Sequence, residues 1–240
     1  MVRKFYSTTE SAKIYSVYQP IIALQSEQIV GYEALARGTG KWNLPLELFR
    51  AAYEEGYAVS LDLNCMKAAF EALPKLGPGQ KLFVNVEPMT VATAFQAGGA
   101  AELLLRRIKP FAKHLVFELT EGMKARDFDR VKQGVEFLRR FVYRFALDDV
   151  AGIGLKLLKL LSLKPNYIKI DMALVQGLSQ SSIQQDLLRH LIELGRKSRS
   201  ELIAEGIERK RDLDYVKKLG IRFGQGFYFA RPSKTLLKAL

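Results

Sequence analysis

Short segments rich in β-branched and aromatic residues alternate with longer amphipathic segments along nearly the whole chain. This alternation is typical of βα units and argues against a helical bundle or a β-sandwich. The segments that we predict to be strands are 15–22, 28–36, 81–87, 114–120, 143–149, 166–171, 201–207 and 226–230. The first two read as a hairpin, so we expect one antiparallel strand in an otherwise parallel sheet.

The length of the chain fits one particular arrangement of such units. A single (β/α)8 barrel has about 250 residues, and this chain has 240 without a long Pro/Gly/Ser linker or an internal repeat. We therefore predict an α/β protein with a TIM-like (β/α)8 barrel, mostly parallel with one antiparallel strand, which forms a single domain over residues 1–240.

Net charge and cysteine content indicate which kinds of partner and which cellular compartment suit this chain. There are 37 Lys and Arg residues against 25 Asp and Glu, so the net charge of +12 favours a partner that carries phosphate. Cys65 is the single cysteine, which excludes an intramolecular disulfide and suits a reducing, cytoplasmic compartment. The N-terminal residues lack the apolar run of a secretory signal, and no run of about 18 apolar residues predicts a membrane span.

Polar residues fall at the carboxyl ends of the predicted strands, which are otherwise apolar. In a barrel these ends meet at one mouth, where active sites of this architecture are built. So many carboxylates at one mouth would repel each other unless cations bind there, so we expect a divalent metal site, with two ions bridged by one Asp. The residues at these ends are Glu33, Asn85, Glu118, Asp148, Asp149, Lys169, Asp171 and Glu205.

The types of residue at these ends indicate which metal would bind. His114 and His190 are the two histidines, and neither HExxH nor CxxC spacing is present, which argues against zinc. Carboxylates with one amide suit Mg²⁺ or Mn²⁺, ions that commonly act on phosphate esters. The sequence has no P-loop motif, no GxGxxG after a strand and no GxSxG elbow, which argues against nucleoside triphosphate hydrolysis, dinucleotide binding and a serine hydrolase.

Seven motifs follow one another in a family-like order and spacing. They are YQPIIALQSEQIVGYEALARG, FVNVEP, FELTEG, ALDD, YIKID, AEGIE and GQGFYFARP. Together they resemble the EAL domain, the cyclic-di-GMP phosphodiesterase family, whose naming tripeptide matches Glu33, Ala34 and Leu35. The resemblance covers essentially the whole chain and implies that cyclic-di-GMP binds across the mouth and is opened to linear pGpG.

The resemblance also implies roles for single residues. The positions that match Glu33, Asn85, Glu118 and Asp148 hold one ion, and Asp148 bridges to a second ion that Asp149 also holds. Lys169 would position the attacking water, and Glu205 would act near the second ion as ligand or general base, so Glu33, Lys169 and Glu205 are the expected catalytic residues. Arg37 would contact a phosphate, with Leu35 beside it, and Gln225 and Asp171 would contact substrate or support the metal ligands.

Two positions depart from the family pattern. Where active relatives carry a loop similar to FGTGYSS, residues 150–156 read VAGIGLK and lack its hydroxyls, although Glu121, which anchors that loop in the family, is retained. Glu87 stands where many relatives have Ser, and we expect it to be a solvated acid, with a surplus metal ligand as the alternative.

The leucine-rich segment after Asp149 is expected to form a helix and to mediate a homodimer.

Three functions therefore compete. The complete set of acids, amide and lysine favours a Mg²⁺- or Mn²⁺-dependent cyclic-di-GMP phosphodiesterase. The altered loop favours a receptor that binds cyclic-di-GMP without cleaving it and acts through a protein partner. The net charge and the basic runs at 196–200 and 208–212 suggest a nucleic-acid binder, which is the weakest hypothesis because these runs lie at helix ends among acids.

Overall fold

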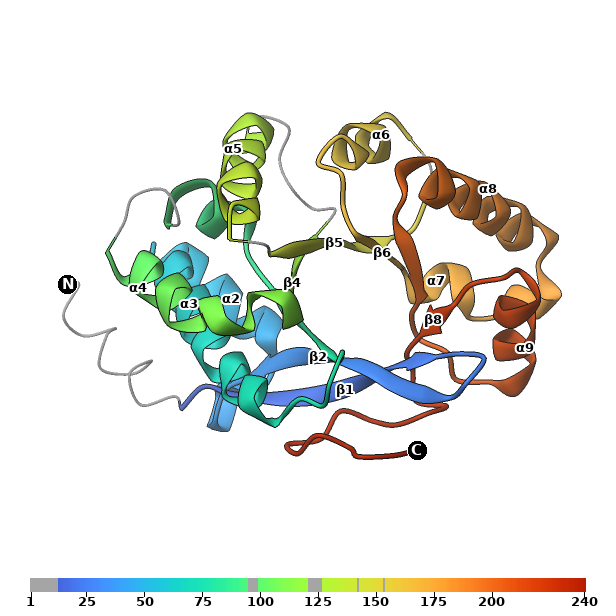
Figure 1. Cartoon of the computed structure of the whole chain (residues 1–240), viewed down its shortest axis with the longest axis horizontal. Coiled ribbons are helices and arrows are strands. Elements are labelled where there is room, and N and C mark those ends of the chain that lie inside the picture. Colours follow the sequence, from blue (N-terminus) through green and yellow to red (C-terminus); the bar gives the residue numbers. More distant parts are fainter. Residues whose placement is uncertain (1–12, 95–98, 121–126, 142, 153) are drawn as a thin grey trace.

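The computed structural model describes residues 13–94, 99–120, 127–141, 143–152 and 154–240. Its strands form a closed barrel in the order β1 to β8, with the helices around the outside (Figure 1). The strands are β1 (Tyr15–Ala23), β2 (Gln28–Arg37), β3 (Lys81–Asn85), β4 (Leu115–Thr120), β5 (Arg144–Val150), β6 (Tyr167–Ile170), β7 (Glu201–Ala204) and β8 (Phe223–Gly224). The predicted α/β barrel is confirmed.

Strand direction also agrees with the prediction. β1 pairs antiparallel with β2 on one side and with β8 on the other, while all pairs from β2 to β8 are parallel. β1 is therefore the single antiparallel strand. Because it runs the opposite way, β1 brings its N-terminal half to the mouth, up to Gln19, which pairs with Glu33.

The prediction of the last strand was wrong. β8 is the two-residue Phe223–Gly224, and residues 226–230 form a turn in which the Phe229 and Ala230 amides donate to the Gly226 carbonyl. The aromatic residues of this segment have high β-propensity, but tertiary packing overrides it. A Cβ at Gly226 would lie 2.1 Å from the Ile207 carbonyl oxygen, so the chain turns where it passes closest to its neighbour.

The helices pack around the barrel wall. They are α2 (Pro45–Glu54), α3 (Ala58–Ala69), α4 (Ala100–Ile108), α5 (Phe128–Arg139), α6 (Leu155–Leu161), α7 (Met172–Val175), α8 (Ser182–Ser198) and α9 (Lys210–Lys218), with 3-10 turns at Gly40–Trp42, Phe70–Lys75, Lys109–His114 and Leu178–Gln180, and one π-helical turn, η3, at Thr90–Ala94. α2 begins at Pro45, and proline suits the first turn of a helix because it lacks an N–H that would be unpaired there. α8 is capped by Ser181, whose side chain accepts a hydrogen bond from the Gln184 amide.

Three apolar regions of the described residues hold the fold together. The largest lies between the barrel and the helices. A second joins α2 and α3 through Leu48, Ala52, Leu61 and Cys65. The third lies inside the barrel and consists of Ile21, Phe83, Val116, Ala146 and Ile203. Since side chains of a strand alternate between the two faces, this inner layer separates the polar residues at one end of the barrel from those at the other. Among the described helices, none has the length and apolar character that a membrane crossing requires.

Candidate active site

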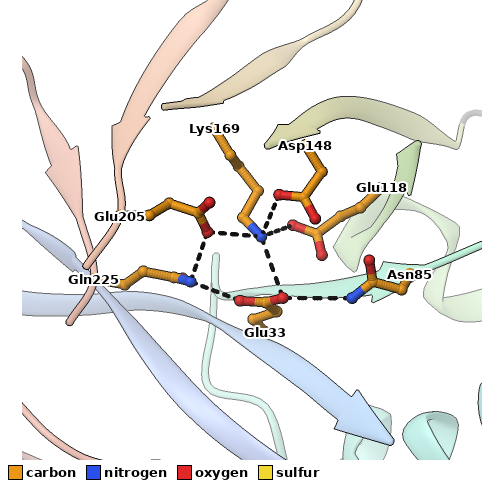
Figure 2. A network of polar contacts seen from close by, with 7 residues as sticks. All are labelled: Glu33, Asn85, Glu118, Asp148, Lys169, Glu205 and Gln225. Carbon is orange, nitrogen blue, oxygen red and sulfur yellow. Dashed lines mark hydrogen bonds and ion pairs between the residues drawn. The ribbon is translucent and has the colours of Figure 1, made fainter. Parts of the chain in front are cut away.

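The charged residues predicted at the strand ends meet around one lysine. The Nζ atom of Lys169 lies 2.9 Å from Glu118 Oε1, 2.9 Å from Asp148 Oδ1, 2.9 Å from Glu205 Oε1 and 3.2 Å from Glu33 Oε1 (Figure 2). The five side chains come from five different strands or strand ends. Their convergence follows from the period of two within each strand, which turns these side chains toward the barrel axis.

Two amide side chains complete the cluster. Gln225 Nε2 donates to Glu33 Oε2 at 2.6 Å and to Glu205 Oε1 at 2.9 Å, and Asn85 Nδ2 donates to Glu33 Oε1 at 3.4 Å (Figure 2). Gln225 follows β8 directly and is buried. By bridging two acids on opposite flanks of β8, Gln225 fixes the spacing of their carboxylates.

The cluster is buried and carries an excess of negative charge. Glu118 and Lys169 are 0% and 1% exposed, and four carboxylates against one ammonium leave a net charge of −3 when all are ionised. Burial raises the pKa of Glu118 well above its usual range, against the opposing effect of Lys169. Burial by itself lowers the pKa of Lys169, but the surrounding carboxylates, with Asp148 first, outweigh it and raise that pKa.

Two further carboxyl groups, those of Glu205 and Asp149, have pKa values raised toward neutral pH. Burial raises the pKa of Glu205 to about 8, since the stabilisation by Lys169 is countered by Asp148 and Glu33. Asp149 behaves similarly, with its pKa raised to about 6 by burial and by the charge of Asp148. Carboxyl groups with perturbed pKa values that share a concave site are typical of catalytic and ligand-binding sites.

The carboxylates form two trios that share one residue. Ligand atoms of Glu33, Glu118 and Asp148 lie within 4.8 Å of one another, and so do those of Asp148, Asp149 and Glu205. Glu118 Oε2 is buried and has no hydrogen-bond partner among the described residues. Burying a carboxylate oxygen without a donor is costly, so the trios fit the demand of divalent cations for oxygen ligands.

A cavity of about 220 Å³ opens beside the second trio. Asp149, Asp171, Glu205, Glu208, Met172 and Phe227 are among the residues that line it. Asp149 has φ 56°, a left-handed conformation that is uncommon for residues other than glycine. The chain thus turns sharply between Asp148, which faces the barrel axis, and Asp149, which faces this cavity.

The other residues predicted for the site lie around it. Leu35 and Arg37 are partly buried near the end of β2, where Arg37 donates to the Ala36 carbonyl at 2.8 Å. Asp171 caps α7 by accepting a hydrogen bond from the Ala173 amide at 2.7 Å, and it also lines the cavity. Glu121, predicted to anchor the loop, lies outside the described residues.

Glu87, expected to be a solvated acid, is bound by neighbouring residues and does not belong to either trio. Its carboxylate accepts a hydrogen bond from the Tyr53 hydroxyl, and its backbone amide donates to Asp62 at 3.0 Å. Asp62 is 2% exposed, and burial raises its pKa to about 7. The segment that follows Asn85, the last residue of β3, is therefore held against α2 and α3.

The sequence interpretation missed Gln19. This residue is buried, is directly paired with Glu33 across β1 and β2, and lines the cavity. Its Nε2 donates to the Ala230 carbonyl at 3.1 Å. The available signal was a polar residue in a mostly apolar segment, but Gln19 lies at the centre of that segment, whereas the sequence interpretation considered the carboxyl ends of the strands.

The chain is similar in sequence to known proteins. The sequence matches the model of the EAL domain over residues 3–232. A probable cyclic di-GMP phosphodiesterase, PdeB of Escherichia coli K12, is 27% identical over 95% of this chain and 45% of its own length, and a second, PdeG of the same strain, is 28% identical over 92% and 45%. The chain thus spans about half the length of these curated relatives.

Solved structures agree with the fold. A stand-alone versatile EAL protein from Vibrio cholerae O395, crystallised with c-di-GMP, superposes with a TM-score of 0.82 at 24% identity, over 96% of this chain and 97% of that chain. BlrP1 of Klebsiella pneumoniae, in a complex with calcium and c-di-GMP, gives a TM-score of 0.80 at 25% identity, over 94% and 57%. With the match of the family over nearly its full length, the chain belongs to the EAL domain family.

Proposed function

We propose that this protein hydrolyses cyclic-di-GMP to linear pGpG with two divalent ions, Mg²⁺ or Mn²⁺. The observation that carries the proposal is the pair of acidic trios joined by Asp148. It is supported by relatives named as probable cyclic di-GMP phosphodiesterases and by complexes of BlrP1 with calcium or manganese and the dinucleotide. The same residues on a differently connected fold would support phosphate chemistry but not this substrate.

The donor set divides naturally between two ions. Glu33, Asn85, Glu118 and Asp148 would hold the first, and Asp148, Asp149 and Glu205 the second. When bound, such ions neutralise phosphoryl oxygens and lower the pKa of water. With all four carboxylates ionised, the net charge of −3 around Lys169 would be offset by the positive charge of two divalent cations.

The protein's own residues would position the attacking water and accept its proton. The Lys169 ammonium has three N–H groups, which four carboxylates surround in this structure. In the proposed reaction, Lys169 would give one of these hydrogen bonds to the attacking water and position it against the phosphorus. The water oxygen forms a new P–O bond as one phosphodiester P–O bond to a ribose oxygen breaks. The proton that the water loses passes to a carboxylate, and the departing ribose oxygen takes up a proton from solvent to become the free hydroxyl of pGpG. Glu205 lies beside Lys169 and lines the cavity, and its ionised form is suited to receive this proton because burial makes its carboxylate a stronger base than an exposed one.

Substrate contacts would come from residues at the rim. Arg37 has the planar fork that suits a phosphate, with Leu35 two residues before it on the same face of β2. Asp171 and Gln225 line the cavity beside the second trio. The net charge of +12 draws an anionic dinucleotide toward the protein, while the mouth itself is acidic and needs its ions to accept it.

The test is a product assay with purified protein. Cyclic-di-GMP incubated with Mn²⁺ is expected to yield pGpG on chromatography, and Glu33→Ala is expected to abolish the product because it removes a ligand of the first ion. Glu47→Ala, which removes an exposed acid on α2, is the matched control and should remain active. Absence of pGpG from the wild type across pH and metal conditions would overturn the proposal.

A receptor that binds cyclic-di-GMP without cleaving it is the second candidate. It is favoured by the segment after Asp149, where Ala151, Gly152 and Gly154 stand in place of the family's hydroxyl-bearing loop and a Cβ built on either glycine meets nothing within 4 Å. Such a loop gives the second trio little support. Calorimetry that shows binding of an intact dinucleotide, with no pGpG after prolonged incubation with Mn²⁺, would favour this function.

We further propose that the protein forms a homodimer through α6. We also propose that it works in the cytoplasm, a reducing compartment that suits a chain whose single cysteine, Cys65, is free and buried. Leu155 and Leu158 on this helix are 86% and 51% exposed, next to the loop that follows Asp149. Sedimentation of the wild type is expected to show a dimer, and the double substitution of Leu155 and Leu158 by Glu is expected to give a monomer. A wild type that stays monomeric at high concentration would exclude the dimer.

A further inference from the structure

The end of the barrel opposite the carboxylate cluster carries basic residues. Lys81 begins β3 and Arg144 begins β5. Each stands two residues before a member of the inner apolar layer, Phe83 and Ala146, so its Cβ points to the same inner face. The strands thus present carboxylates at one end, apolar side chains in the middle and cations at the other end.

These cations crowd one another. Lys81 Nζ donates to the Lys113 carbonyl at 3.0 Å, and the pKa of Lys81 is lowered, first by burial and then by the charges of Arg144 and Lys113. No carboxylate of the described residues forms an ion pair with any of the three. Glu201, which begins β7 at the same end, is paired with Arg222 at 2.7 Å. An anion that binds here would therefore relieve a repulsion that the fold leaves in place.

A cavity of about 220 Å³ lies beside Lys81. Its apolar wall consists of Ile21, Val30, Phe83, Tyr167, Ile203 and Phe223. The rings of Phe83 and Tyr167 meet edge to face, with centroids 5.0 Å apart, which makes one side of the wall aromatic. The volume is below the range of about 300–1,000 Å³ typical of drug-sized ligands, so the cavity suits a fragment such as one aromatic ring.

We propose that this end of the barrel binds a small organic anion with an apolar body, either a carboxylate or a phosphate monoester. The apolar body lies against Phe83, Tyr167 and Phe223, and the anionic group faces Lys81 and Arg144. The apolar layer separates this site from the carboxylate cluster. The proposal stands apart from the proposed phosphodiesterase function and does not depend on it.

The test uses phenyl phosphate and benzoate as probes in calorimetric titrations of the full chain. At least one of them is expected to bind saturably. Its fragments are the controls: phenol lacks the charge, and inorganic phosphate or acetate lacks the ring, so each should bind at least tenfold more weakly. Lys81→Met and Arg144→Met should each weaken the probe about tenfold, while Lys132→Met, at an exposed position on α5, should leave it unchanged.

A measurement on the wild type guards against variants that fail to fold. In protein with isotope-labelled isoleucine methyl groups, the bound probe is expected to shift the signals of Ile21 and Ile203, which line the cavity, and to do so equally in Glu33→Ala, whose change lies beyond the apolar layer. The proposal is overturned if neither probe binds at about 10 mM, if the ring-free anions bind as tightly, or if Ile21 and Ile203 do not respond.

Discussion

The Nζ atom of Lys169 lies 2.9 Å from Oδ1 of Asp148, the one residue that belongs to both acidic trios. The lysine therefore sits where the two proposed ion sites meet, and its ammonium supplies part of the positive charge that the carboxylates need. Because Lys169 and its partners are almost completely buried, this compensation acts at short range and with little screening by solvent.

Lys169→Met is expected to destabilise the protein in metal-free buffer. The substitution leaves four buried carboxylates without their ammonium, and breaking a buried ion pair in this way costs about 3–5 kcal/mol. Chemical denaturation with a chelator present measures the loss. Lys132→Met, on the exposed face of α5, serves as the control, and a Lys169→Met protein as stable as the wild type would show that the carboxylates do not depend on this cation.

Glu118→Gln should change stability and activity in opposite directions. Removing one of four crowded carboxylates lessens the repulsion, so in metal-free buffer the variant should be at least as stable as the wild type. With Mn²⁺ its thermal stabilisation should be smaller and hydrolysis of cyclic-di-GMP should fall at least 100-fold, because a ligand of the first ion is gone.

Thermal melts with and without Mn²⁺, together with the product assay, test this prediction. The exposed Glu136→Gln on α5 is a matched control and should behave as the wild type in both. If Glu118→Gln kept its full response to Mn²⁺, Glu118 would not be a ligand.

The closed barrel and the meeting of its polar strand ends follow from patterns that sequence reasoning handles well. Alternation of strands and helices sets the fold, and the direction of parallel strands places residues as distant as Glu33 and Glu205 at one mouth. No knowledge of side-chain contacts is needed for that step, because strand ends converge whatever packs behind them.

Contacts that depend on packing could not be obtained in this way. Residues 226–230 have the composition of a strand, yet close approach to Ile207 makes them a turn. Gln19 was overlooked because it lies at the centre of β1, opposite Glu33, whereas the sequence reasoning considered the carboxyl ends of the strands. The central place of Lys169 was also beyond prediction, since its long side chain has many rotamers and only the fold decides which acids it reaches.

Asp62→Asn should alter how stability depends on pH. The folded protein holds the pKa of Asp62 at about 7, mainly through burial, against an ordinary value of 3.8. Below pH 3.8 both states are protonated; as the pH rises toward 7, the unfolded chain releases this proton first, so the wild type loses stability across that window. Asn cannot ionise and keeps an oxygen that can accept from the Glu87 amide, so it should avoid the loss.

Urea denaturation of both proteins near pH 4 and near pH 8 measures the effect. The stability of Asp62→Asn relative to the wild type should increase by about 2–4 kcal/mol between these conditions. The exposed Asp129→Asn is the control and should show little change. An equal difference at both pH values would mean that Asp62 titrates normally in the folded protein.

Gly134→Ala tests the packing that supports the loop after β3. Gly134 lies on α5, and a Cβ there would come within 2.1 Å of the carbonyl oxygen of Val91 in η3. In an open helix the change to Ala is worth up to about 1 kcal/mol in stability. Here a backbone atom stands in the way, so we expect a loss of about 1–3 kcal/mol.

The control for this substitution is Gly154→Ala, where a Cβ meets nothing within 4 Å. It should leave the midpoint of denaturation nearly unchanged, whereas Gly134→Ala should lower it. The alanine Cβ at position 134 fits only if η3 moves away from α5. Because η3 follows closely after Asn85 in the chain, this movement should also weaken the stabilisation of the variant by Mn²⁺. A Gly134→Ala protein with the stability of the wild type would show that α5 and η3 are not in such close contact.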